Sequence, residues 1–184
     1  MSDSNLLNKA KILVVDDEED LLDLIKMILK GSLYEVHTTS SGRIALEKLQ
    51  EENYAVFILD IIMPEISGHE LALKIKQIPK YKDTPIVFIT GYMDEVEDIF
   101  EKYDTYGPVD YMMKPLDYHM LQSKINFLSQ LFYQKLALEN INKKRLQEIE
   151  QRKQIEQQLE ERIKELEKEL NDRIQAEKSL ENQE

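Results

Sequence analysis

The sequence predicts an α/β fold, a doubly wound five-stranded parallel sheet, followed by a long α-helix. Short apolar runs rich in β-branched and aromatic residues alternate with segments in which apolar residues have helical spacing. Such alternation favours a parallel sheet, because parallel strands need connections of about helix length. All five glycines and all five prolines lie at or before Pro115, so neither helix-breaking residue type interrupts the remaining chain.

The predicted strands are short runs dominated by apolar and β-branched residues. They are Lys11–Val15, Tyr34–Thr38, Ala55–Leu59, Pro85–Ile89 and Val109–Met113. Apolar residues at helical spacing predict the covering helices Glu19–Lys30, Ser41–Glu51, Gly68–Ile78 and Met93–Tyr103. Ligands of doubly wound folds bind beyond the carboxyl ends of the strands, so the polar residues at those ends form the candidate site.

Length and composition limit the function classes. A chain of 184 residues has room for one domain of typical size and an appendage. The formal net charge of −12 repels nucleic-acid phosphates and anionic lipid, so we expect no nucleic-acid partner and no direct membrane contact. The absence of cysteine excludes disulfides and thiolate chemistry. Since no apolar stretch has the length of a signal peptide or membrane span, we expect a cytoplasmic protein.

Charged and polar residues follow the predicted strands. The first strand runs into the acidic series Asp16–Glu19, the third into Asp60 and the fourth into Thr90, while Lys114 follows the fifth. Like charges at the ends of buried strands need compensation, and carboxylates without a nearby histidine or cysteine favour Mg²⁺ or Mn²⁺. Taken by itself, the acidic series also fits a solvated helix start, where acids favour the positive end of the helix dipole.

The position of Asp60 favours a metal-binding or catalytic role of the acidic residues over a solvated helix start. It interrupts an apolar run that extends from Phe57 to Met63, where an uncompensated carboxylate would be costly. A carboxylate beside a bound metal and a lysine ammonium can act as a nucleophile toward phosphorus, because both cations neutralise charge on the transferring group. The sequence therefore indicates phosphoryl transfer at Asp60.

Four motifs coincide with the predicted strand ends. They are Ile12–Asp17, Asp60–Gly68, Pro85–Gly91 and Asp110–Pro115. In this order and spacing they closely resemble the receiver domain of two-component response regulators and hybrid histidine kinases, which has a flavodoxin-like fold. The resemblance covers residues 10–128, after an N-terminus at residues 1–9 that we expect to be flexible.

The resemblance implies a role for each matching residue. Asp60 matches the phosphoacceptor, and Thr90 and Lys114 match the hydroxyl and the ammonium that bind the phosphoryl group. Tyr111 matches the aromatic switch whose rotamer follows Thr90. The implied metal ligands are Asp16, Asp17, Asp60 and the backbone carbonyl of Ile62. The expected cofactor is Mg²⁺, with Mn²⁺ as a substitute.

Beyond Leu116 the sequence predicts one long helix that continues the last receiver helix, and residues 129–184 fit a single coiled-coil heptad frame. Its apolar positions predict a parallel homodimer with the seam Leu128, Leu131, Leu138, Ile149, Leu159, Ile163, Leu166 and Leu170. Polar seam residues from Asn142 to Glu156 weaken the middle of this seam. A charged solvated helix or a partly disordered tail is the alternative.

These features predict a phosphoacceptor module of a two-component phosphorelay. A phosphohistidine donor kinase or phosphotransfer protein would phosphorylate Asp60, and the dimeric coiled coil would carry the signal to an output domain. The chain itself would catalyse its own phosphoryl transfer and dephosphorylation. Because the sequence stops within the helical pattern, we expect a fragment of a larger chain, such as a hybrid histidine kinase.

Three alternatives stay open. A scaffold would use the coiled coil to dimerise and would never be phosphorylated. A receiver-linked cyclase would carry a different output domain. A DNA-binding response regulator is disfavoured by the acidic net charge and by the lack of a recognition domain in this sequence.

Overall fold

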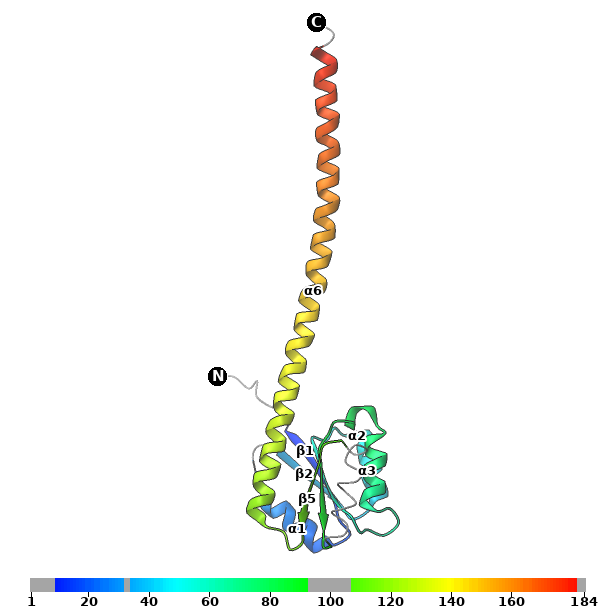
Figure 1. Cartoon of the computed structure of the whole chain (residues 1–184), viewed down its shortest axis with the longest axis vertical. Helices are drawn as coiled ribbons and strands as arrows, with labels where there is room; N and C mark the ends of the chain where they lie inside the picture. The colour runs from blue at the N-terminus through cyan, green and yellow to red at the C-terminus, as the bar shows by residue number, and fades with distance from the viewer. Residues whose placement is uncertain (1–8, 32–33, 93–106, 182–184) are drawn as a thin grey trace. The chain divides into compact units, whose positions relative to one another are not determined.

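The computed structural model describes residues 9–31, 34–92 and 107–181, with side chains described up to residue 174. The chain divides into two compact units, one up to Gln134 and one from Lys135 onward. The first unit contains a five-stranded parallel sheet of order β2-β1-β3-β4-β5 (Figure 1). This confirms the predicted doubly wound α/β fold with a long helix after it.

Each observed strand begins and ends within one residue of its prediction. The strands are β1 Ala10–Val15, β2 Tyr34–Thr39, β3 Val56–Asp60, β4 Ile86–Thr90 and β5 Val109–Met113. Every residue of β3 and β4 is buried, as expected for central strands of a parallel sheet covered on both faces. The chain leaves β1 first toward β2 and later continues to β3, so the strand order reverses beside β1. Ligands of such sheets bind at this point.

Helices cover both faces of the sheet (Figure 1). They are α1 Glu19–Ile28, α2 Gly42–Glu51, α3 Gly68–Lys76 and the long α6 Tyr118–Glu181, with a short 3₁₀ helix η1 at Pro79–Tyr81. Alternate strand residues serve opposite faces. Leu13 and Leu59 pack with α2 and α3, whereas Val14 and Ile58 pack with α1 and the first turns of α6.

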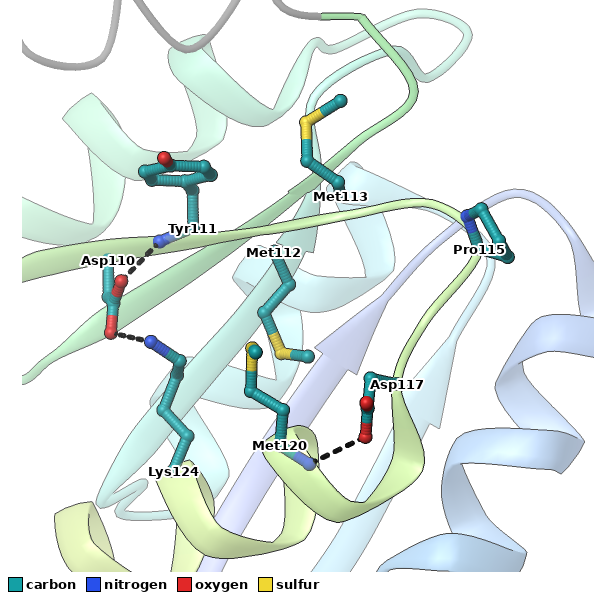
Figure 2. A pocket seen from close by; sticks show the side chains of 8 residues that line it. All are labelled: Asp110, Tyr111, Met112, Met113, Pro115, Asp117, Met120 and Lys124. Atoms are coloured by element: carbon teal, nitrogen blue, oxygen red, sulfur yellow. Dashed lines mark hydrogen bonds and ion pairs between the residues drawn. The ribbon is translucent and has the colours of Figure 1, made fainter.

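Three helix boundaries differ from the prediction by two residues. Helix α1 ends at Ile28 instead of Lys30. The other two differences have local reasons. Helix α3 ends at Lys76 because Ile78 precedes Pro79 and therefore adopts an extended backbone, with ψ of 116°. Helix α6 begins at Tyr118, two residues later than expected, because the Asp117 carboxylate accepts a hydrogen bond from the Met120 N–H at 2.9 Å and caps the helix (Figure 2). The predicted helix Met93–Tyr103 lies outside the described residues.

The first turns of α6 belong to the receiver unit. Leu121 and Ile125 are fully buried against the sheet, and the Tyr133 hydroxyl accepts a hydrogen bond from the Ala10 N–H at 2.8 Å. Leu128, the first residue of the predicted seam, is half-buried against the same apolar cluster. Its side chain therefore already has contacts within its own chain.

The second unit is helical from Lys135 to Glu181, and every residue from 135 to 174 is exposed. Among the described residues, no helix combines the length and the apolar character needed to cross a membrane.

Gly68 permits a close approach between α3 and the end of β3. Its N–H donates to the Ile61 carbonyl at 2.9 Å, and a Cβ built on it would lie 2.1 Å from the Asp60 carbonyl oxygen. Such a distance is far inside van der Waals contact, so any larger side chain would displace the loop between β3 and α3.

We predict that Gly68→Ala lowers the free energy of unfolding by about 1–3 kcal/mol, as expected for overpacking of a rigid site. Denaturation followed by tyrosine fluorescence measures this in the receiver unit, because all nine tyrosines lie at or before Tyr133. Gly91→Ala is the matched control, since a Cβ there meets nothing within 4 Å, and its effect should stay below about 0.5 kcal/mol. Equal effects of the two substitutions would contradict this account.

Candidate functional site

Three carboxylates meet at the carboxyl edge of the sheet. Asp16 follows β1, Asp17 comes next, and Asp60 is the last residue of β3. The parallel register pairs Val15 with Leu59, which sets Asp16 beside Asp60 although the two are far apart in sequence. One oxygen from each of the three carboxylates lies within 4.8 Å of the others. Asp16 and Asp60 are buried, whereas Asp17 is exposed.

Lys114 supplies the positive charge of this cluster. Its Nζ donates to the Asp60 Oδ2 at 3.0 Å and to the Glu18 Oε1 at 3.0 Å, and it lies 3.2 Å from the Asp16 Oδ2. The Lys114 backbone N–H donates to the Thr90 carbonyl at 2.7 Å, which fixes the lysine beside the end of β4. One ammonium is therefore shared among three carboxylates.

Burial and charge shift the pKa values of the site. Burial raises the pKa of Asp16 to about 6, and the neighbouring Asp60 carboxylate adds to this, while the Glu18 N–H and Lys114 oppose it. Burial also raises the pKa of Asp60, although hydrogen bonds from Lys114 and from the Ile62 N–H partly offset the shift. Burial lowers the pKa of Lys114, but its hydrogen bonds to Glu18 and Asp60 outweigh this, so its net shift is upward.

The buried oxygens of this cluster fit a divalent cation. Asp16 Oδ2 is buried and has no hydrogen-bond partner within the described part of the chain, although the Lys114 ammonium lies 3.2 Å away. The combined negative charge of the three carboxylates exceeds the single positive charge of Lys114. Hard oxygen ligands such as these favour Mg²⁺ or Mn²⁺. Asp16, Asp17 and Asp60 are therefore the residues that could hold such an ion.

The other predicted residues surround this cluster. Thr90 is fully buried at the end of β4, and its Oγ1 accepts the Tyr92 N–H at 3.1 Å and donates to the Tyr92 carbonyl at 3.2 Å. Tyr111 is half-buried in β5, opposite Phe88, and packs against the α2–α3 side of the core. Ile62 lies in the loop after β3 with an exposed side chain, and its N–H faces the Asp60 carboxylate.

The contact between Glu18 and Lys114 was not foreseen from the sequence. In the sequence, Glu18 is part of the acidic series Asp16–Glu19 and has no predicted role of its own. The sequence does contain one hint of this contact. A metal site formed by Asp16, Asp17 and Asp60 does not use every carboxylate of the acidic series, and Glu18 is left without a role. Which cation Glu18 meets depends on the fold, because Lys114 is distant in sequence.

A separate hollow of about 450 Å³ lies between β5 and the start of α6 (Figure 2). Methionine side chains 112, 113 and 120 line it together with Pro115. An ion pair between Asp110 and Lys124 closes one side of it. None of the acidic-cluster residues lines this hollow.

A parallel sheet of this strand order, with an acidic cluster and a lysine at its carboxyl edge, defines a receiver domain. The response regulator receiver domain model matches residues 12–126, which is more than half of the chain, and the chain belongs to this family. It is the receiver domain of a two-component response regulator, a class that accepts phosphate from histidine kinases and binds Mg²⁺ at an acidic pocket.

The chain is similar to receivers from several bacteria. The transcriptional regulatory protein SrrA of Staphylococcus aureus is 37% identical over 105 residues, which are 57% of this chain and 42% of SrrA. The match thus spans less than half of that relative. The chemotaxis protein CheY4 of Vibrio cholerae superposes with a TM-score of 0.59 and 28% identity, over 65% of this chain and 98% of CheY4.

A further solved structure is the signal receiver domain of a signal transduction histidine kinase from Syntrophus aciditrophicus. It superposes with a TM-score of 0.58 and 26% identity, over 66% of this chain and 90% of that chain. The similarities to the two solved structures cover about two thirds of this chain. They confirm the receiver fold that the sequence motifs predicted.

We predict that Asp16→Asn stabilises the metal-free protein near neutral pH, by about 1–3 kcal/mol. The pKa of Asp16 is raised from 3.8 to about 6 in the fold, so the folded chain holds this proton more tightly than the unfolded chain. Stability should therefore fall as pH rises from about 4 to about 6 and then level off. Urea denaturation in the presence of a chelator, repeated across this pH range, measures the difference between wild type and variant.

Asp17→Asn is the control, because it removes the same charge from an exposed side chain and should change stability by less than about 0.5 kcal/mol. The gain from Asp16→Asn should disappear below about pH 4, where the wild-type carboxyl is protonated in both states. A gain that is independent of pH would show that burial of an ionised Asp16 is not its cause.

Proposed function

We propose that this chain is a phosphoacceptor that takes a phosphoryl group on Asp60 from the phosphohistidine of a kinase or phosphotransfer protein, and that a dimeric coiled coil transmits the result to an output domain. One observation carries the proposal. The Asp60 carboxylate lies at the end of a buried strand between two further carboxylates and the Lys114 ammonium. A carboxylate with these neighbours suits attack on phosphorus.

The chain's own residues account for the transfer. An Asp60 oxygen bonds to phosphorus while the P–N bond of phosphohistidine breaks, and the imidazole nitrogen leaves with the electron pair. Lys114, 3.0 Å from Asp60, neutralises charge on the phosphoryl oxygens, and the Thr90 hydroxyl turns from Tyr92 to donate to one of them. Mg²⁺ or Mn²⁺, bound by Asp16, Asp17, Asp60 and the Ile62 carbonyl, would neutralise the remaining charge.

The same charges would drive a conformational change on phosphorylation. A phosphoryl group adds about −1.5 to −2 charge and several acceptor oxygens at the site. These attract Thr90 and Lys114, which are joined by a backbone hydrogen bond of 2.7 Å and lie on neighbouring strand ends. Movement of Thr90 opens space for Tyr111 on the same side of the sheet, so this ring would report the phosphorylation state.

We predict that Asp60→Asn abolishes phosphorylation because it removes the nucleophilic oxygen while keeping size and polarity. Incubation with a small phosphodonor and Mg²⁺, followed by intact-mass measurement, should show one added phosphoryl group on the wild type and none on the variant. Asp20→Asn, an exposed acid in the first turn of α1, is the control and should be phosphorylated as wild type is. Chelation of the metal should also prevent the reaction. Phosphorylation of the Asp60→Asn protein would refute the assignment.

The helix beyond Lys135 supports pairing with a second copy. An isolated helix needs tertiary or quaternary contacts to persist in water, and the apolar side chains of this one are exposed. The seam that we propose comprises Leu131, Leu138, Ile149, Leu159, Ile163, Leu166 and Leu170, with Leu128 contributing to the extent that its intrachain contacts allow.

Charges beside the seam favour parallel pairing. In the heptad frame, a flanking position of one helix meets the position five residues later on its parallel partner. Glu148 then meets Lys153 of the second copy, and Arg162 meets Glu167 of the second copy. Both pairs are attractive. Within the single chain, Arg162 instead pairs with Glu165 at 2.8 Å, so dimerisation would offer it an alternative acid.

We predict that single cysteines at Leu159 and Leu166 form like-with-like disulfides in the oxidised protein, because parallel seam positions face their own copies. The chain has no native cysteine, so each variant reports one position. Glu161→Cys, on the opposite side of the helix, is the control and should cross-link weakly. A monomer by light scattering at micromolar concentration, or cross-links that require antiparallel helices, would overturn the dimer.

The signal would pass from the receiver to an output domain. SrrA is a transcriptional regulator and the Syntrophus protein is a histidine kinase, so similar receivers serve different outputs. The net charge of −12 argues against nucleic-acid binding by this chain itself, and the coiled coil suits transmission along a helical linker to a kinase or cyclase domain in the cytoplasm. A scaffold that is never phosphorylated would leave the Asp60, Lys114 and acidic-cluster arrangement without a use.

A further inference from the structure

Glu18 is held by the backbone in a position that frees its side chain. Its N–H donates to the Asp16 Oδ1 at 2.8 Å, and its carbonyl accepts the first hydrogen bonds of α1, from Leu21 and Leu22. It is the N-cap residue of α1, yet its carboxylate makes no capping hydrogen bond. The carboxylate instead reaches Lys114, with Oε1 at 3.0 Å from Nζ.

The three carboxylates around Lys114 differ in exposure. The side chains of Asp16 and Asp60 are 0% and 7% exposed, whereas that of Glu18 is 64% exposed. An ion pair that water screens is weak, and holding it costs side-chain freedom. The contact between Glu18 and Lys114 is therefore the one that breaks most readily.

The ammonium of Lys114 has three N–H donors. Two of them already bond to Glu18 and Asp60, and the third side faces Asp16 Oδ2 at 3.2 Å. A phosphoryl oxygen can gain a donor from Lys114 only when one of these contacts is released. Asp16 and Asp60 are buried beside the lysine, so the contact to be released is the one with Glu18.

We propose that Glu18 is a positioning residue that restrains Lys114 in the unphosphorylated site and thereby weakens binding of an incoming phosphoryl group. This inference rests on the proposed function. Phosphorylation adds about −1.5 to −2 charge close to the Glu18 carboxylate, which favours departure of Glu18 from the site. Glu18 thus stabilises the unphosphorylated arrangement of Lys114 against the phosphorylated one.

Two substitutions separate the contact from the charge. Glu18→Gln removes the charge at constant size, and Glu18→Asp keeps the charge but shortens the side chain by one methylene, which breaks the 3.0 Å contact. Asp20→Asn removes one charge from an exposed residue two positions further along α1 and serves as the control.

The first readout is the rate of phosphorylation against the concentration of acetyl phosphate at saturating Mg²⁺. Glu18→Gln and Glu18→Asp should each lower the concentration for half-maximal rate by about two- to fivefold, with little change in the maximal rate, because only binding of the phosphoryl group is relieved. Asp20→Asn should match wild type. The inference would be overturned if wild type and both Glu18 variants behaved equally. It would also be overturned if Asp20→Asn gave the same effect as Glu18→Gln while Glu18→Asp had no effect.

The second readout does not require phosphorylation. The side-chain ¹⁵Nζ signal of Lys114 in the metal-free protein, assigned by its loss in Lys114→Arg, should shift in both Glu18 variants and not in Asp20→Asn. If the wild type is not phosphorylated at all, the proposed function fails, and an unshifted Lys114 signal would separately show that Glu18 does not restrain the lysine.

Discussion

Two carboxylates, Asp16 and Asp60, are buried at the carboxyl edge of the sheet, and the rest of the site follows from the need to compensate their charge. Burial of an ionised carboxylate is costly, and it raises the pKa of both groups. Lys114 offsets part of this cost through contacts of 3.0 and 3.2 Å. The charge that Lys114 leaves uncompensated is the charge that a divalent cation would neutralise.

Strand order brings these groups together. Because β1 lies between β2 and β3, the residues after β1 and at the end of β3 meet at one edge, and β4 then aligns Thr90 with the backbone of Lys114. The close approach at Gly68 anchors the loop that follows Asp60. Four segments that are distant in sequence are thus held together by buried strands, and Asp60 and Thr90 are the last residues of two of these strands.

The first turns of helix α6 are partly buried, whereas the rest of the helix is exposed. Its first turns are part of the receiver core through Leu121 and Ile125, and the hydrogen bond between Tyr133 and Ala10 ties it to the start of β1. From Lys135 onward the same helix exposes its apolar side chains. Helix α6 therefore contributes to the receiver core at its start and presents exposed apolar side chains further along the chain.

Local sequence patterns determined the strands, most helix boundaries and the identity of the candidate residues. Periodicity of apolar residues is read directly from the chain, and it located every strand to within one residue. The early end of α3 before Pro79 and the cap at Asp117 are also local effects, because a proline and a capping residue act on the backbone within a few residues.

Tertiary structure decided which charged groups meet. The sequence placed Glu18 in an acidic series and Leu128 in a seam, but the contact between Glu18 and Lys114 and the packing of Leu128 on the receiver core depend on strand order and on the direction in which α6 crosses the sheet. Neither is encoded by spacing along the chain, because residues distant in sequence become neighbours only when the sheet assembles. The full burial of Asp16, and with it the raised pKa, has the same origin.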